Sequence, residues 1–224
     1  MDTHLQQLIN ELHKMSDILS DYDHDKAHNV LKQLSEMGAA AAPASGLLGR
    51  LLVQKWYREN LIHLITQTLI KIGPGAAPAS IYSIQEMAKP NNVSASDIAY
   101  ACSDALIAIG PYPDNLYAIL TLAVDLYNEY DNTTRSFTSY DLSVVRQAIR
   151  MTLEGFGHGA APLIPTLVGY AKGPNPDIAW FSVQILGSIG AAAVPALRKI
   201  AGLFSDYPSD VKRAAREAIN RIKN

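Results

Sequence analysis

The chain has 224 residues, a formal net charge of −2 from 19 basic and 21 acidic residues, and a single cysteine, Cys102. The near-balance of charge argues against binding to the phosphate backbone of nucleic acids, since such proteins carry a basic excess. One cysteine excludes an intrachain disulfide and a cysteine metal cluster. The N-terminal residues lack the pattern of a signal peptide, and we find no run of ~18–20 apolar residues, so we expect a cytoplasmic protein without a membrane span.

A repeated pattern predicts where each helix ends. Glycine is followed five residues later by proline at four places, and a fifth glycine is an imperfect copy; these junction glycines are Gly38, Gly73, Gly110, Gly157 and Gly190. Glycine is favoured just past a helix end, where the backbone is left-handed. The proline that follows is tolerated in the first turn of the next helix. Each repeat therefore predicts a pair of antiparallel helices.

The residues before each junction glycine define one buried stripe of a helix. Leucine stands four positions earlier in all five copies, and we call this the leucine row: Leu34, Leu69, Leu106, Leu153 and Leu186. Further apolar residues stand twelve positions earlier, at a spacing that matches an amphipathic helix. Asp or Asn stands thirteen positions earlier in most copies, which predicts the N-cap of that helix. The C-terminal segment fits as a sixth copy, with Lys223 at the glycine position.

In chain order, we expect an all-α fold of about six helix pairs in a single elongated domain, 1–224. The pairs are 3–20 with 25–37, 43–56 with 60–72, 78–89 with 97–109, 114–128 with 141–156, 162–172 with 177–189, and 195–205 with 210–222. An insertion within 125–141 accounts for the longest step between glycines, and we expect a loop there. The insertion adds four aromatic residues: Tyr127, Tyr130, Phe137 and Tyr140.

The pattern Asp-x4-Ala…Ala-Leu-x-x-Ile-Gly-x-x-Ala-x-Pro-x-Leu is clearest at 177–200 and 210–222. It resembles HEAT repeats, and it is most similar to the short HEAT-like repeats of phycobilisome lyases. The resemblance covers nearly the whole chain. It implies an armadillo-like α-solenoid in which the second helix of each pair lines a concave surface. The family mostly supplies protein-binding scaffolds, while some members are enzyme components and a few bind nucleic acid.

The second helices carry a series of varied side chains on the side away from the leucine row. They stand ten and six positions before each junction glycine, and we call them the ladder: His28, Lys32, His63, Gln67, Tyr100, Asp104, Gln147, Met151, Trp180, Gln184 and Arg213. Trp, Tyr and Arg are enriched at binding hot spots. The ladder is therefore a candidate binding surface on the concave face; ordinary helix packing and solvation explain the same pattern equally well.

The segment 155–159, Gly-Phe-Gly-His-Gly, has the glycine density of a phosphate-binding loop. It does not match a dinucleotide fingerprint, because a helix rather than a strand is predicted before it, and three sister copies need no phosphate. We interpret Gly157 as the end of a helix and Ala161-Pro162 as the start of the next. His158 is then a surface residue, and Gly155 and Gly159 have no predicted role.

Other candidate sites have simpler interpretations. His24 and His28 are four residues apart, as in some zinc sites, but His24 precedes the expected helix, and we predict no metal site. Cys102 stands at a core position, so we expect no nucleophile there. A basic run near the C-terminus fits either nucleic-acid contact or the solvated face of a terminal helix, and it comprises Lys212, Arg213, Arg216, Arg221 and Lys223.

These observations favour a non-catalytic scaffold that binds a protein or peptide on the concave ladder, with Tyr100 and Trp180 as anchors. No catalytic constellation and no cofactor site is visible in the sequence. Two alternatives from other classes remain open: a component of a bilin lyase-type enzyme, and nucleic-acid binding through the basic C-terminal helix.

Overall fold

The computed structural model describes residues 3–17, 24–54, 59–89, 95–132, 139–202 and 206–223. The regular structure of these ranges is helical, without a strand, which confirms the all-α class. The chain divides into two compact units. Unit 1 comprises Met1–Ile109 and Phe137–Val145, and unit 2 comprises Gly110–Ser136 and Arg146–Asn224. A single elongated domain stays a prediction.

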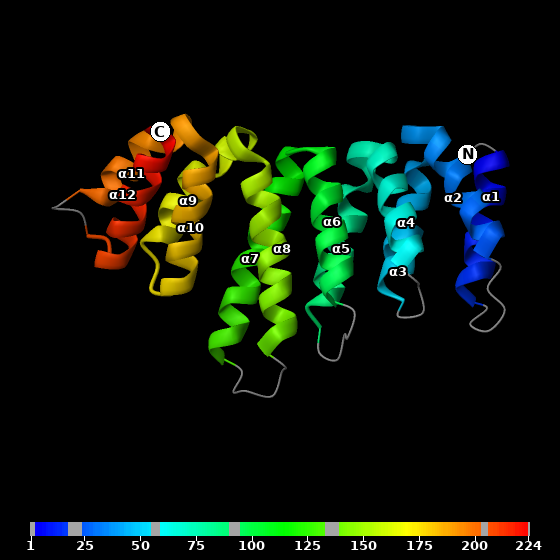
Figure 1. Ribbon diagram of the computed structural model, residues 1–224, viewed down its shortest axis with the longest axis horizontal. Coiled ribbons are helices and arrows are strands. Elements are labelled where there is room, and N and C mark those ends of the chain that lie inside the picture. Colours follow the sequence, from blue (N-terminus) through cyan, green and yellow to red (C-terminus); the bar gives the residue numbers. More distant parts are fainter. Residues whose placement is uncertain are drawn as a thin grey trace. The chain divides into compact units, whose positions relative to one another are not determined.

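Unit 1 contains consecutive helix pairs stacked side by side. Its helices are α1 (Thr3–Asp17), α2 (His24–Met37), α3 (Ser45–Val53), α4 (Glu59–Ile72), α5 (Ala77–Met87) and α6 (Ala95–Ile109). The second helices pack in sequence, α2 against α4 and α4 against α6, while α3 packs against α5 (Figure 1). Helices at equivalent places in the repeat therefore become neighbours.

Unit 2 repeats this arrangement towards the C-terminus. Its helices are α7 (Pro113–Asn132), α8 (Ser139–Gly155), α9 (Ile164–Ala171), α10 (Pro176–Ile189), α11 (Val194–Ala201) and α12 (Ser209–Lys223); α8 begins in unit 1 and belongs to unit 2 from Arg146 onwards. The helices pair as α9 with α10 and α11 with α12, and the second helices α10 and α12 pack against each other.

The leucine row forms the centre of the core, as the repeat predicts. All five leucines have an exposed fraction of 0%. The apolar residues expected eight positions further back are buried as well: Leu61, Ile98, Val145, Ile178 and Val211. At about 25 cal/mol per Å² of apolar surface removed from water, full burial of a leucine side chain contributes roughly 1.5–3 kcal/mol. The row is therefore a principal source of stability.

Buried hydroxyl groups connect neighbouring pairs within unit 1. Thr68 Oγ1 donates to the Leu64 carbonyl oxygen at 2.8 Å in its own helix, and it lies 3.3 Å from the Leu31 carbonyl oxygen of α2. Ser83 Oγ on α5 likewise lies 3.0 Å from the carbonyl oxygens of Ala79 and Gly49. Because these hydroxyl groups reach backbone acceptors, their burial costs little.

All five junction glycines have positive φ angles, between 50° and 99°, which confirms the predicted helix ends. Four short 3-10 segments follow them within the described residues: η1 (Gly38–Ala44), η2 (Gly73–Ala76), η3 (Gly157–Leu163) and η4 (Gly190–Ala193). Pro78 and Pro195 lie in the first turns of α5 and α11, as expected. Pro43 and Pro162 instead lie inside η1 and η3, so α3 and α9 begin later than predicted.

Gly159, to which the sequence assigns no role, has a structural one. A Cβ atom at this position would lie 2.3 Å from Cγ of Pro111, at the preceding junction of unit 2. A Cβ at Gly75 in η2 would similarly lie 3.0 Å from the Cβ of Ala42 in η1. Small residues two positions after a junction glycine therefore let neighbouring junctions pack closely. The sequence-based interpretation of Gly159 was wrong, because this contact joins different repeats.

The predicted N-cap of α10 is also wrong. Asn175, two residues before Asp177, has an extended backbone, and its side-chain oxygen accepts hydrogen bonds from the backbone N–H groups of Asp177 and Ile178 at 3.0 and 3.3 Å. Asp177 lies in the first turn, where a carboxylate interacts favourably with the helix dipole. Asp25, Asp97 and Asp210 also lie in first turns. The conserved spacing of these acids within the repeat therefore marks first-turn residues rather than caps.

The insertion lengthens helices instead of forming only a loop. Residues 125–132 continue α7, and α8 begins at Ser139. The Tyr127 ring lies 5.2 Å from the Phe181 ring of α10, and the Arg146 guanidinium lies 4.7 Å from the Tyr127 ring centroid. Tyr127 thus joins the end of α7 to α10 within unit 2, and burial raises the pKa of its hydroxyl. Phe137 and the side chains of Tyr130 and Tyr140 lie outside the described residues.

One helical stretch, Pro176–Ala201, is long and apolar enough to be a candidate membrane span by length and composition. Half of its most apolar window is buried inside the protein. The stretch also comprises two helices, α10 and α11, which are separated at Gly190, where φ is 81°. Its burial is typical of core helices, so the stretch is weak evidence for membrane insertion.

Candidate functional site

The ladder lies on the second helices of both units, and its side chains differ in exposure. In unit 1, five of its side chains are exposed and Tyr100 is half-buried; the exposed ones are His28, Lys32, His63, Gln67 and Asp104. In unit 2, Gln147, Met151 and Gln184 are half-buried, while Trp180 and Arg213 are exposed. The helices therefore place the predicted residues at the surface or at its edge, within each unit.

A pocket of about 360 Å³ lies between α4 and α6, and we call it the α4/α6 pocket. It brings together the ladder residues His63, Gln67 and Asp104. The other ladder residues of unit 1 do not line it. The remaining lining residues are Ile62, Thr66, Ile70, Asp97 and Ala101. Two carboxylates beside an apolar floor can accept hydrogen bonds from a cationic or amide group.

The sequence-based prediction missed the role of Asp97 in this pocket. It assigned Asp97 to an N-cap, whereas the structure places it in the first turn of α6 and at the edge of the α4/α6 pocket. The spacing offered a signal, because Asp97, Ala101 and Asp104 follow one another at intervals of four and three residues. Such residues share one face of a helix.

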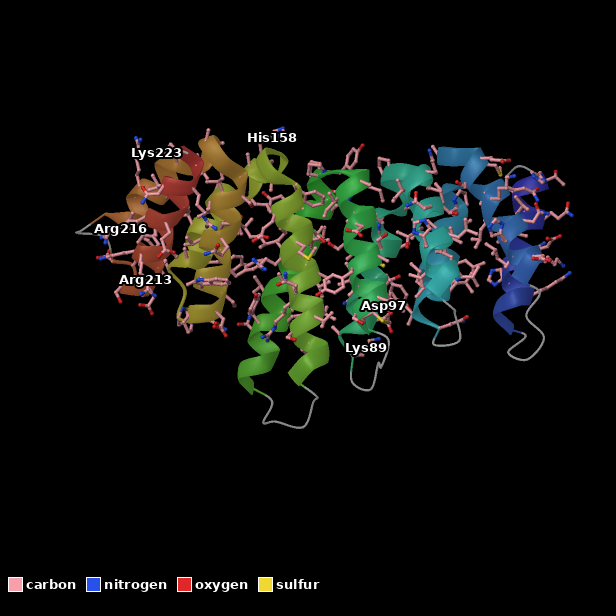
Figure 2. All side chains as sticks on the ribbon, viewed as in Figure 1. Lys89, Asp97, His158, Arg213, Arg216 and Lys223 are labelled. Atoms are coloured by element: carbon pink, nitrogen blue, oxygen red, sulfur yellow. The ribbon has the colours of Figure 1, made fainter. Side chains whose placement is uncertain are left out.

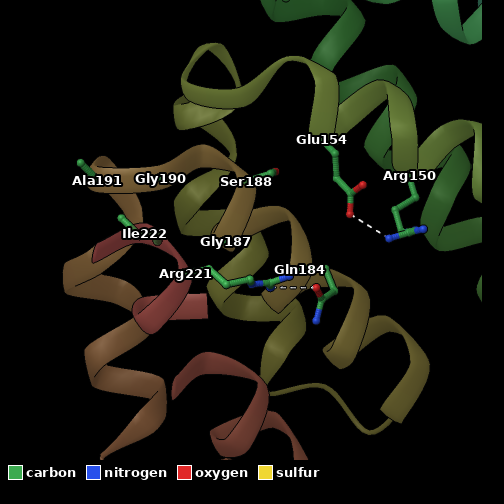
Figure 3. A pocket seen from close by; sticks show the side chains of 9 residues that line it. All are labelled: Arg150, Glu154, Gln184, Gly187, Ser188, Gly190, Ala191, Arg221 and Ile222. Atoms are coloured by element: carbon green, nitrogen blue, oxygen red, sulfur yellow. Dashed lines mark hydrogen bonds and ion pairs between the residues drawn. The ribbon is translucent and has the colours of Figure 1, made fainter. Parts of the chain in front are cut away.

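A second pocket, of about 690 Å³, lies between the carboxyl-terminal parts of α8, α10 and α12, and we call it the arginine pocket (Figure 3). Gln184 is the ladder residue that lines it. Its charged lining residues are Arg150, Glu154 and Arg221. Arg150 Nη1 lies 3.0 Å from Glu154 Oε1, and Arg221 Nη2 donates to Gln184 Oε1 at 3.2 Å.

The sequence-based prediction missed Arg150 and Glu154, and it assigned Arg221 to the basic C-terminal run rather than to a pocket. Arg150 and Glu154 continue the face of α8 that starts at Gln147, at intervals of three and four residues. Arg150 and Glu154 stand seven and three positions before Gly157, whereas the ladder consists of the positions ten and six before each junction glycine. Arg221 meets Gln184 only because α10 and α12 are packed together.

The basic run on α12 has partners within the protein. Arg216 donates through Nε and Nη2 to the carbonyl oxygen of Ala201, at 3.3 and 3.2 Å, and so caps the end of α11. Arg221 is held by Gln184. Lys212 is half-buried, whereas Arg213 and Lys223 are exposed (Figure 2). Two of the five basic side chains thus have a structural role.

The remaining candidates lie where the repeat predicts them. Cys102 is completely buried, and burial raises the pKa of its thiol to about 12, so a reactive thiolate does not form near neutral pH. His158 is exposed on η3. No group of three metal-ligating side chains occurs within the residues that the structure describes. His28 is exposed on α2, and the His24 side chain is outside this set.

Comparison with models of known protein families and with curated proteins finds no match to this chain. The resemblance to HEAT-like repeats rests on the repeat pattern of the sequence and stays a prediction.

Proposed function

We propose that this protein is a non-catalytic scaffold that binds a protein or peptide on the exposed face of its second helices. One observation carries the proposal: the α4/α6 pocket and the arginine pocket both lie between consecutive second helices, on the face that bears the ladder. The proposal includes a HEAT-like α-solenoid in the cytoplasm, in which this face is concave. Small-angle X-ray scattering tests the solenoid, since an elongated particle is expected.

The composition of this face supports binding. Trp180 has an exposed fraction of 45% on α10, although a large aromatic side chain gains free energy from burial. Polar, charged and aromatic side chains alternate along the ladder, while the leucine row of the same helices does not vary. A face whose chemistry varies between repeats can contact a partner of irregular sequence, and aromatic residues supply much of the affinity of such contacts.

The side-chain contacts of the arginine pocket support a binding role rather than catalysis. The hydrogen bonds that join its side chains connect guanidinium groups with carboxylate or amide oxygens. Within the described residues, no contact in either pocket pairs a nucleophile with a general base, which acyl or group transfer by a side chain would use. Cys102, the one thiol, is buried in the core.

Affinity capture with the full chain tests the proposal. Proteins retained by the tagged wild-type chain in extracts of its host are compared with those retained by a Tyr100→Ala/Trp180→Ala variant. We expect a specific partner to bind this variant at least about tenfold more weakly, because both rings lie on the ladder. Tyr112→Ala is the matched control: Tyr112 has an exposed fraction of 44% but lies between α6 and α7 and is not part of the ladder.

The control should retain the partner at the wild-type level. If the folded double variant retains every specific partner as well as the wild type does, the second-helix face is not the binding surface. Circular dichroism confirms that each variant is folded.

A further inference from the structure

We propose that the arginine pocket binds a carboxylate side chain of an acidic peptide segment. The inference rests on the proposed function and assigns a chemistry to the partner. Arg150 on α8 and Arg221 on α12 line the same pocket, together with the amide of Gln184 and the hydroxyl of Ser188 (Figure 3). Guanidinium groups present paired N–H donors that match the two oxygens of a carboxylate.

The donors of both arginines are only partly used inside the protein. Arg221 donates from Nη2 to the amide oxygen of Gln184, which positions the guanidinium without neutralising its charge. Arg150 donates from Nη1 to Glu154 and from Nη2 to Gln147, the latter at 2.8 Å. A guanidinium carries five N–H donors, so each group keeps donors for a ligand.

The packing of α10 gives Arg221 its position. Gly187 lies beneath the guanidinium: a Cβ atom there would be 3.6 Å from Arg221 Nη2 and 3.1 Å from the Cβ of Ala218. The missing side chain lets α12 approach α10 closely at Ala218, one turn before Arg221, whose guanidinium reaches Gln184. The Arg150 and Glu154 side chains are 26% and 31% exposed, so solvent screens their charges only in part. Arg221 is exposed, so a ligand can reach its guanidinium, which the hydrogen bond to Gln184 orients.

The charge of the pocket favours a single carboxylate over phosphate. Two guanidinium groups and the Glu154 carboxylate leave one net positive charge among the lining side chains. A carboxylate carries one negative charge, whereas a phosphomonoester carries nearly two at neutral pH. The carboxyl end of α10, at Gly190, also lines the pocket and adds partial negative charge. A second negative charge on the ligand would therefore be repelled.

Fluorescence anisotropy with the full chain tests this inference. The probe is a fluorescein-labelled poly-glutamate peptide, and a labelled poly-glutamine peptide is its neutral counterpart. We expect binding of the poly-glutamate peptide, with little binding of poly-glutamine. Arg150→Gln and Arg221→Gln should each weaken binding by about tenfold, because each removes a charged hydrogen-bond donor. Glu154→Gln should strengthen binding by about threefold, because it removes a competing carboxylate.

Arg198→Gln is the matched control. Arg198 is exposed on α11 in the same unit but does not line the pocket, so the variant loses the same charge and should change binding by at most about twofold. The inference is overturned if poly-glutamate does not bind, or if Arg198→Gln weakens binding as much as Arg221→Gln does. It is also overturned if inorganic phosphate or single-stranded DNA displaces the peptide more effectively than acetate at equal ionic strength.

The two proposals fail differently. If poly-glutamate does not bind but captured partners are lost from the Tyr100→Ala/Trp180→Ala variant, the scaffold function stands and only the carboxylate preference is wrong. If the partners bind that variant normally and the peptide still depends on Arg221, the pocket binds carboxylates but the ladder is not the partner surface.

Discussion

The leucine row and the ladder lie on the same helices and in the same repeat register, yet they have opposite properties. The leucine row has one residue type and is completely buried in every copy. The ladder changes from imidazole to phenol, amide, indole and guanidinium between copies, and most of its side chains reach the surface. Packing against neighbouring helices fixes volume and polarity at the first set of positions. The second set is free of that constraint, so its chemistry can serve binding.

The largest expected effect comes from the leucine row. Leu69→Ala should lower the free energy of unfolding by about 3 kcal/mol, because it removes a fully buried side chain and leaves a cavity. Urea denaturation followed by circular dichroism measures the change. His63→Ala on the same helix is the control and should change stability by no more than about 0.5 kcal/mol. Equal losses of stability in the two variants would contradict the distinction between the leucine row and the ladder.

A smaller loss of stability is expected at the junctions, which belong neither to the leucine row nor to the ladder. Gly159→Ala should cost about 1–3 kcal/mol, because the new methyl group would meet the rigid ring of Pro111. Gly169→Ala in α9 is the control: it has open space at this position and should be neutral or stabilising by up to about 1 kcal/mol. In the Pro111→Ala background, Gly159→Ala should cost less, and a thermodynamic cycle measures the coupling. If the stability changes of Gly159→Ala and Pro111→Ala add without coupling, position 159 does not contact Pro111.

Still smaller losses of stability are expected at the start of α10, where they distinguish the N-cap residue from the acid of the first turn. Asn175→Ala should lower stability by about 1 kcal/mol, because it leaves two backbone N–H groups without their acceptor. Asp177→Asn should lower it by about 0.5 kcal/mol, since it removes only an interaction with the helix dipole at an exposed position. Thermal denaturation at low and high salt distinguishes them: salt should reduce the effect of Asp177→Asn alone. A larger loss of stability for Asp177→Asn than for Asn175→Ala would support Asp177 as the cap.

The smallest effect on stability is expected on the ladder. Trp180→Ala should change the free energy of unfolding by no more than about 0.5 kcal/mol, because Trp180 keeps an exposed fraction of 45% and lies outside the core. Chemical denaturation compares the free energy of unfolding of this variant with that of Phe181→Ala. Phe181 is the next residue of α10 and is fully buried against Tyr127, so its loss should cost about 3 kcal/mol, as for Leu69→Ala. A large loss for Trp180→Ala would assign it to the core instead.

Much of the local structure follows from the sequence. The junction glycines mark helix ends because an L-residue side chain is strained at positive φ, and this requirement is visible in any copy of the repeat. The leucine row is equally visible, since helical periodicity selects one face. The positions of Cys102 and His158 follow by comparison with sister repeats.

The predictions that the structure corrects have two physical causes. Some depend on contacts between different repeats, and the others depend on competition between two local structures that the same residues can form. The helix α7 continues into the insertion, where the Tyr127 ring contacts the Phe181 ring of α10. Both Asn175 and Asp177 are acceptable caps by residue type, and only the backbone conformation selects Asn175. Pro43 fits either a 3-10 turn or the start of a helix.

The sequence by itself determined the helix pairs, their order, their junctions and the faces that they bury, because these depend on residues close together in the chain. The tertiary structure alone decided which side chains from different helices meet. Arg150 and Arg221 are far apart in sequence, and they line one pocket because α8, α10 and α12 end near it. Gly159 and Pro111 meet for the same reason. Periodicity specifies the face of a helix, whereas the packing of one helix against the next specifies the site.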